Sequence, residues 1–348
     1  MPAPPSAASK RSLAVLALLA LLLALPWGHL MAAGAVVNLQ VENDLFGNGL
    51  DRHYTNGFRL NYLTREYQAP GWMRFLGDYL PGVDARCTDC GQRTSLSLGH
   101  NIYTPEDITT PTLIEDDRPY AGWLYGSIAL MSRHGGPAAA GLSWERLDTY
   151  VLNLGVVGPS AQGDTLQKEW HELIDTRQPR GWDNQLRDEL TVNAYHSRQW
   201  RHTAWKTIGL QADVMPHLGY ALGNVHIMGG AGLTLRLGNS LRGDFGPPRI
   251  RPSLPGGGFF TLARDGVEWY LFGGVEGRVV ARNIFLDGNT FRDSHSVDRK
   301  PLVADLQFGL VVTWESLRLS FTNVFRSDEF DGQQGDSQFG AISLSWSR

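Results

Sequence analysis

Three features that mark other protein classes are scarce in this 348-residue chain. After residue 35, no segment approaches the ~20 consecutive apolar residues that a membrane-spanning helix needs, which excludes a helical membrane protein. No Lys/Arg-rich tract occurs and the net charge is −4, so nothing indicates a nucleic-acid-binding protein. Cysteine is limited to Cys87 and Cys90, which form a single C-x-x-C pair.

The C-x-x-C pair lacks the sequence context of the usual cysteine chemistries. A redox site would be expected beside a thioredoxin-like βαβ pattern, and a zinc site would need two more ligands nearby. The residues around Cys87 and Cys90 show neither. In an exported chain we therefore expect a local disulfide in a loop, whose role stays open.

The N-terminal segment has the pattern of a signal peptide. Lys10 and Arg11 precede an apolar run from Leu13 to Leu25, and small residues follow up to Ala35. That run is too short to span a membrane as a helix and has the flanks of an export signal. We predict a signal peptide over residues 1–35 and a mature chain over 36–348.

The mature chain shows a recurring alternation of apolar and polar residues. It alternates from Val37 to Glu42, from Leu302 to Leu310 and from Ala341 to Ser347. The stretch from Ala204 to Val214 alternates in the same way. Lipid-facing and lumen-facing residues alternate like this over about ten residues in a transmembrane β-strand.

Twelve segments of this kind are expected as strands. They are 36–45, 54–65, 92–101, 120–133, 138–153, 187–201, 203–220, 225–238, 266–284, 299–314, 316–328 and 336–347. Because single-chain bacterial barrels have even strand counts, we predict an all-β fold, a 12-stranded antiparallel transmembrane β-barrel with a short helix in a surface loop. The alternative is a soluble sandwich or lipocalin-like barrel with its apolar side inward. Residues 259–263 would spoil the even count if they form a further strand.

The connections predict which end of the barrel faces the periplasm. Very tight turns at Arg201–His202 and Glu315–Ser316 fall on one end, together with the longer connections 66–91 and 239–265. If the first strand runs outward, this end faces the periplasm. Three polar clusters fall on the other end. They are Glu42–Gly47 with Asp51–Gly57, Asp116–Trp123, and the long connection 154–186. Polar groups that are distant in sequence and converge on one rim are what a functional site requires.

Within 154–186, the spacing predicts a helix from Ser160 to Thr176. Its apolar stripe contains Leu166, Trp170, Leu173 and Ile174. Gln167 and His171 are four residues apart beside this stripe, so they project along one edge. The stripe is expected to rest on the barrel wall or to enter the outer leaflet. Alternatively, His171 is an ordinary solvated loop residue.

The residue types at the rim suit ester hydrolysis. His171 would act as a general base on water, because the unperturbed histidine pKa of about 6.5 suits proton acceptance near neutral pH. Asn43 and Asp44 offer oxygen ligands suited to calcium, or are simple turn residues. Strand alternation puts these two on opposite faces, so one shared site requires either a bend there or that one of them acts through its backbone. Arg118 would bind a phosphate or an oxyanion, or form a salt bridge with Asp116 or Asp117.

At these residues the sequence resembles the outer-membrane lipid A 3′-O-deacylase family. The resemblance covers the mature chain and rests on four motifs. They are E-N-D-L-F at 42–46, Y-T-N-G at 54–57, D-R-P-Y-A-G-W at 117–123 and Q-x-x-x-H at 167–171. It implies a twelve-stranded barrel that removes the ester-linked 3′ acyloxyacyl group of lipid A, with calcium and a histidine-activated water.

The resemblance also implies roles for individual residues. His171 would be the general base with Gln167 beside it, Thr55 would lie in the pocket, and Asn43 and Asp44 would surround the calcium. A basic residue near the D-R-P-Y-A-G-W motif contacts the substrate, for which Arg118 is the candidate. The family has a glutamate shortly after the histidine, where this chain has Asp175 and its neighbours.

Lipid A or lipopolysaccharide in the outer leaflet of the outer membrane is thus the expected partner, with no nucleic acid, and we expect a monomer. Two other readings of the barrel stay open. One is a pore or structural barrel whose rim residues merely line a vestibule. The other is an outer-membrane phospholipase, which would present a serine nucleophile near the histidine. Ser160 is the nearby serine in the helical segment, and it fits a helix N-cap better.

Overall fold

The computed structural model describes residues 34–44, 53–66, 71, 75, 77, 79–83, 90–135, 144–241, 244–246, 260, 266–334 and 337–347. The predicted signal peptide, except for Gly34 and Ala35, lies outside the described residues, as does Cys87. Cys90 is disulfide-bonded. In the described part of the chain, no helix combines the length and apolarity needed to cross a membrane.

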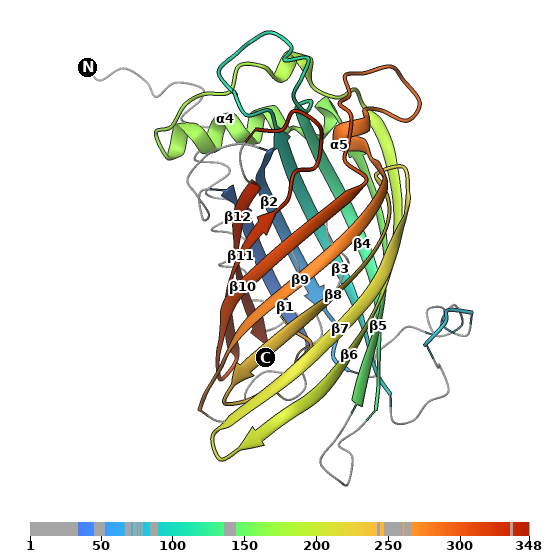
Figure 1. The fold of residues 1–348 in the computed structure, drawn as a ribbon, viewed down its shortest axis with the longest axis vertical. Helices are drawn as coiled ribbons and strands as arrows, with labels where there is room; N and C mark the ends of the chain where they lie inside the picture. The colour runs from blue at the N-terminus through green and yellow to red at the C-terminus, as the bar shows by residue number, and fades with distance from the viewer. Residues whose placement is uncertain are drawn as a thin grey trace.

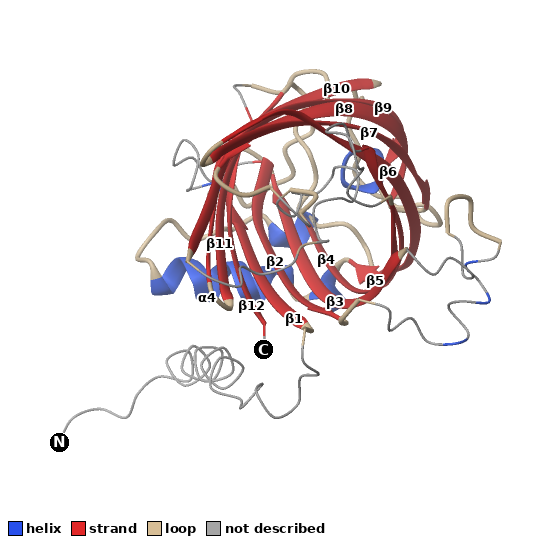
Figure 2. Ribbon diagram, turned by 90° about the horizontal axis from the view of Figure 1, so that it is seen from below, coloured by secondary structure: helices blue, strands red, loops and turns tan. Residues whose placement is uncertain are grey.

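The described strands form one closed antiparallel barrel (Figure 1), in which each strand pairs with its neighbours in sequence and β1 pairs with β12. Figure 2 shows the ring along its axis. The twelve strands are β1 Val36–Asn43, β2 His53–Leu63, β3 Gly91–Thr104, β4 Ala121–His134, β5 Trp144–Val157, β6 Glu189–Thr207, β7 Leu210–Gly223, β8 His226–Gly238, β9 Val267–Asn283, β10 Leu302–Trp314, β11 Leu317–Arg326 and β12 Ser337–Ser347. The predicted fold class is confirmed.

One predicted turn is wrong. β6 continues through Arg201 and His202 to Thr207, and the tight turn is at Ile208–Gly209. The alternating stretch from Ala204 to Val214 is therefore the end of one strand and the start of the next. Alternation could not locate this turn, because both strands keep a period of two. Gly209 takes a positive φ of 84°, which a glycine adopts without steric cost. The turn predicted at Glu315–Ser316 is confirmed.

The orientation of the side chains supports a membrane barrel over a soluble one. In β1, Asn38, Gln40 and Glu42 are buried inside the barrel, whereas the alternating apolar residues face outward. The outward faces of β8, β9 and β10 expose large apolar residues, among them Leu235, Val275, Val279, Leu302 and Leu306. This polar-in, apolar-out arrangement is the reverse of a lipocalin-like barrel.

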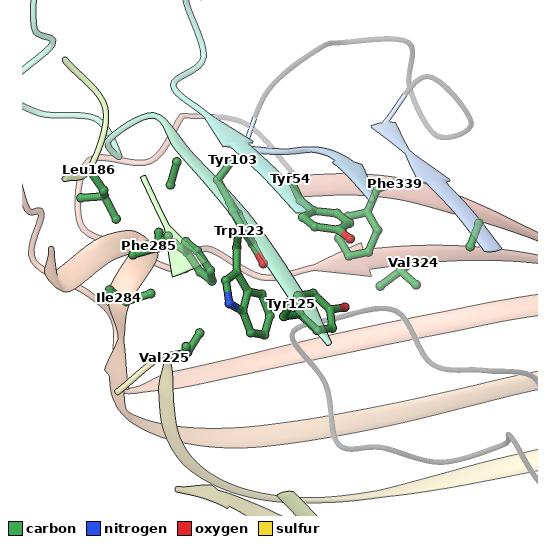
Figure 3. Close-up of a cluster of buried hydrophobic side chains, with 13 residues drawn as sticks. Tyr54, Tyr103, Trp123, Tyr125, Leu186, Val225, Ile284, Phe285, Val324 and Phe339 are labelled. Atoms are coloured by element: carbon green, nitrogen blue, oxygen red, sulfur yellow. The ribbon is translucent and has the colours of Figure 1, made fainter. Parts of the chain in front are cut away.

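Side chains fill the outer part of the lumen. An aromatic cluster (Figure 3) joins Trp123, Tyr125 and Tyr103 to Phe285 of α5, a short helix at Ile284–Asp287. The rings of Trp123 and Tyr125 stack at 3.9 Å, as do those of Tyr103 and Phe285. This packing argues against an open channel at this end.

At the opposite end, residues of the β8–β9 connection enter the barrel. Asp244 and Phe245 are buried, and the Asp244 carboxylate pairs with the guanidinium groups of Arg236 and Arg318 at 3.0 and 2.6 Å. Arg236 also pairs with Asp213 of β7 at 2.5 Å. Buried charges of opposite sign thus neutralise one another where the lumen has little access to water.

Candidate functional site

The helix of the long β5–β6 connection is shorter than predicted. α4 spans Gly163–Leu173, and a turn of 3-10 helix, η2, precedes it at Pro159–Ala161. Ser160 is not the N-cap of α4, because that position belongs to Gln162. Ser160 instead donates its backbone N–H and its hydroxyl to the carboxylate of Asp188, at 2.7 and 2.9 Å. α4 lies at the end of the barrel that also carries α5 (Figure 1).

α4 is oriented with its polar edge toward the protein. Gln167 and His171 are 2% and 3% exposed, whereas Leu166, Trp170 and Leu173 of the apolar stripe are at least one-third exposed. Helices on soluble proteins usually bury the apolar face. The reverse orientation here leaves the apolar stripe available to membrane lipid. This agrees with the expectation that the stripe enters the outer leaflet, and not with the expectation that it rests on the barrel wall.

Two glycines allow α4 to approach the barrel wall closely. A Cβ at Gly122 of β4 would come within 3.0 Å of the backbone nitrogen of Gly163 at the start of α4. Next to this contact, the Gly158 N–H donates to the Gly122 carbonyl at 3.1 Å. The His100 Nε2–H of β3 donates to the Ala161 carbonyl at 2.8 Å. Gly122 of the D-R-P-Y-A-G-W motif thus lies directly against the start of the helix.

The side-chain amide of Gln167 is held by Trp182. The indole Nε1–H of Trp182 donates to Gln167 Oε1 at 2.8 Å, and the Trp182 ring packs against Tyr120 with centroids 5.0 Å apart. This bond orients the amide, since the indole can only donate. Gln167 Nε2 is buried and has no hydrogen-bond partner among the residues that the structure describes. The amide therefore presents a desolvated donor, which is a costly arrangement unless a ligand accepts the hydrogen bond.

His171 is oriented by a backbone carbonyl. Its Nδ1 lies 2.5 Å from the carbonyl oxygen of Arg177. A carbonyl only accepts, so Nδ1 carries the proton and Nε2 is the basic nitrogen of the neutral ring. Asp175, in the stretch where the family has its glutamate, is exposed and lies at a turn after α4 with a positive φ of 52°.

Asn43 and Asp44 lie where β1 ends. β1 stops at Asn43 and Asp44 has left the strand, which removes the conflict that strict alternation raised. The Asn43 side-chain amide donates to the Thr55 carbonyl at 3.0 Å, and the hydroxyls of Thr55 and Thr104 are 2.7 Å apart. Thr55 is the extra residue of a β-bulge between Tyr54 and Asn56. The structure therefore brings Asn43 and Thr55 together, next to a buried Asp44.

These groups belong to the outer surface of the barrel wall. Asn43 is paired in register with Asn56, Asn56 with Ile102, and Ile102 with Gly122. Alternation places this row on the same face as Val37, Leu39 and Val41, which is the lipid-facing side. Ile102 is nevertheless buried, and α4 contacts both β3 and β4. The candidate site is thus located between α4 and the outside of the wall.

Arg118 is engaged with a residue that the sequence did not suggest. Its guanidinium pairs with the Glu329 carboxylate at 2.9 Å and lies over the Phe330 ring at 5.3 Å. Of the partners predicted from the sequence, Asp117 also contacts Arg118, because its carboxylate accepts the Arg118 backbone N–H at 2.7 Å. Burial raises the pKa of Glu329, but its ion pairs with Arg118 and Arg326 outweigh this and hold that pKa below its ordinary value. Contact of Arg118 with substrate stays a prediction.

The donor set for calcium is partial. Calcium takes about 6–8 oxygen ligands. Asp44 supplies a carboxylate and Asn43 an amide oxygen, both buried at the end of β1. Among the described residues, no group of three or more His, Cys, Asp or Glu side chains is placed to hold a metal ion. The residues fit an ion whose remaining ligands come from backbone, water or substrate phosphate.

Several contributors to the site were not predicted from the sequence. They are Trp182, the Arg177 carbonyl, Thr104 and the close approach of Gly122 to Gly163. A backbone carbonyl carries no residue-specific signal, and Trp182 lies fifteen positions from its partner. The only available hint was Gly122, whose lack of a side chain inside a strand indicates a close backbone approach.

Comparisons with known proteins identify the family and the fold of the chain. A family described as "Outer membrane protein LpxR" matches residues 13–348. Among solved structures, LpxR from Salmonella typhimurium aligns with a TM-score of 0.69 and 20% identity, over 90% of this chain and 100% of that one, a likeness that establishes the fold. The β domain of the Bordetella autotransporter Brka aligns with a TM-score of 0.43 and 8% identity, over 91% and 100% of the two chains. Among curated proteins, none matches this sequence.

Proposed function

Because this chain belongs to the outer membrane protein LpxR family, we propose that it is an outer-membrane lipid A deacylase. Its reaction is hydrolysis of the ester-linked 3′ acyloxyacyl group of lipid A. The observation that carries this proposal is the buried polar edge of α4, with an oriented histidine and an amide donor facing the lipid side of the wall. A pore would need its polar groups in the lumen, and a soluble substrate would not reach a site that faces the membrane lipid.

His171 is the general base. Its Nε2 takes a proton from a water molecule, and the water oxygen bonds to the ester carbonyl carbon. The carbon–oxygen bond to the sugar then breaks, and the proton passes from His171 to the sugar oxygen. The products are a fatty acid and a lipid A hydroxyl. The Arg177 carbonyl keeps the ring in the tautomer that this step requires, and stabilises the imidazolium that forms.

Gln167 supplies the donor for the developing oxyanion. Its Nε2 is already desolvated and is oriented through the bond from Trp182 to Oε1. A donor that is fixed before the reaction costs no reorganisation when charge develops on the carbonyl oxygen. Thr55 is proposed to line the same pocket, with its hydroxyl 2.7 Å from the hydroxyl of Thr104.

Calcium is the proposed cofactor, held by Asp44 and Asn43. When bound, it would supply a positive charge that polarises the ester carbonyl and neutralises a lipid phosphate. Asp44 and a phosphate are both anions, and two anions in one site repel each other unless a cation lies between them. The hydrogen bond from the Asn43 side-chain amide to the Thr55 carbonyl fixes the end of β1. The side-chain oxygens of Asn43 and Asp44 therefore stay in place without the substrate.

Mass spectrometry of lipid A tests the function directly. Cells that produce the wild-type protein should contain lipid A that lacks the 3′ acyloxyacyl group, and cells that produce His171→Ala should retain it. His202→Ala is the matched control, because His202 lies near the opposite end of the barrel, stacked on Trp144. Heat-modifiability in electrophoresis checks that each barrel is folded. Unchanged lipid A with wild-type protein would refute the deacylase, and phospholipid hydrolysis in the same cells would point to a phospholipase instead.

A further inference from the structure

A groove of about 540 Å³ lies on the outside of the barrel wall, over β1 to β5. Its first row across the strands consists of Leu60, Leu98, Gly126 and Leu154, paired in register. The next row includes Leu96 and Ile128. All of these point to the lipid side, so the groove is open to the hydrocarbon of the membrane and not to water.

Gly126 makes the hollow. A Cβ at this position would meet no atom closer than the Ser97 carbonyl oxygen at 4.0 Å. The side chains on either side, Leu98 and Leu154, are both 54% exposed and stand out from the wall. The groove therefore has two apolar walls and a floor that lacks a side chain, with room for a linear apolar chain.

The groove lies on the same wall as the candidate site. The row that α4 covers contains Ile102 and Gly122, and the row with Leu98 and Gly126 is four residues further along the same strands. Four residues correspond to about 13 Å along a strand. One leaflet of the hydrocarbon core is about 15 Å thick, half of the whole core. The groove thus begins where a lipid tail would lie if its ester were under α4.

We propose that this groove binds a hydrocarbon tail of the acyl group whose ester is hydrolysed, and that Gly126 determines which tails fit. This inference rests on the proposed deacylase function. Since the tail leaves lipid and not water, burial of apolar area contributes little, and the groove acts by packing and orientation. A tail fixed along the wall leaves its carbonyl fewer positions relative to His171, which raises the rate at a given substrate concentration.

A second groove provides a matched control. It has about 520 Å³ and lies on the outer wall over β8 to β10, with Gly277 in its floor. A Cβ at Gly277 would meet no atom within 4 Å. Among the described strands, α4 makes its main contacts with β3 and β4. The two grooves therefore share their size, their place on the outer wall and a glycine in the floor, and they differ in their position relative to the site.

The experiment compares Gly126→Leu with Gly277→Leu. The substrate is purified lipid A in detergent micelles, in forms whose 3′ acyl chains differ in length. Gly126→Leu should lower kcat/KM for the longest chains by about tenfold relative to the shortest, the lower end of the effect expected for one methylene in an apolar pocket. Gly277→Leu should retain the wild-type dependence on chain length. Leu98→Ala, which widens the groove, should shift the preference toward longer chains.

The outcomes separate this inference from the function on which it rests. A folded wild-type protein that hydrolyses no lipid A would overturn the deacylase itself. A wild-type deacylase whose Gly126→Leu and Gly277→Leu forms show the same chain-length dependence would overturn the groove alone. If Gly126→Leu fails the heat-modifiability check, Leu98→Ala decides, and an unshifted chain-length preference in that variant would refute the assignment.

Discussion

The bond between Trp182 and Gln167 predicts that a residue outside the four sequence motifs controls the rate. Trp182→Phe keeps an aromatic ring against Tyr120 and removes the Nε1–H that donates to Gln167 Oε1 at 2.8 Å. The buried amide oxygen then loses its partner, which costs about 1–3 kcal/mol. If the amide rotates or shifts as a result, it stabilises the transition state less. The expected fall in kcat/KM is roughly 5- to 150-fold.

The assay is hydrolysis of lipid A in detergent micelles by purified, folded enzyme. A double-mutant cycle with Gln167→Leu separates positioning from stability, because Trp182→Phe should cost little once the amide is gone. Trp144→Phe serves as the control, since Trp144 lies near the other end of β5 and is exposed. A folded Trp182→Phe enzyme with wild-type kcat/KM would refute the positioning role. If Trp182→Phe lowers kcat/KM equally with and without the Gln167 amide, Trp182 contributes to stability only.

Three further predictions concern the metal, the rim and the helix. Chelation should stop hydrolysis and added calcium should restore it, and Asp44→Ala should need more calcium; full wild-type activity in excess chelator would exclude the metal. Because the folded pKa of Glu329 is lowered, its ionised form stabilises the rim above its ordinary pKa of 4.5. That contribution is lost as pH falls through the lowered folded pKa. The melting temperature, followed by heat-modifiability, should therefore fall at acid pH in the wild type and should fall less in Glu329→Gln. Gly122→Val should displace α4 and lower kcat/KM at least tenfold with the barrel intact, whereas Gly229→Val is a control on a distant strand.

The orientation of α4 shows where local sequence rules stop. The spacing of Leu166, Trp170 and Leu173 predicted an amphipathic helix, and the helix exists. Its apolar face is exposed, which in water would be unfavourable. The lipid environment resolves this, because an apolar face costs nothing against acyl chains, and the polar edge is then free to build a site against the wall. The helix could not be oriented from its sequence without its surroundings.

The sequence by itself determined the barrel. Alternation with a period of two is a local property, and the even count of twelve segments with turn residues between them leads to a closed membrane barrel. It also placed Asn43, Asp44, Thr55, Gln167 and His171 at one end, since the direction of each strand follows from the parity of the count. The sequence did not predict the position of the β6–β7 turn, because alternation continues unchanged on both sides of Gly209.

Tertiary structure alone decided how the site is assembled. The β-bulge at Thr55 and the end of β1 at Asn43 decide which oxygens lie together, and both depend on pairing between strands. The Arg177 carbonyl orients His171, and a backbone group has no residue identity to read. Arg118 finds Glu329, 211 positions away in the chain, because ring closure brings the β3–β4 and β11–β12 connections to the same rim. Contacts of this range depend on the closure of the whole barrel, which no local pattern in the sequence encodes.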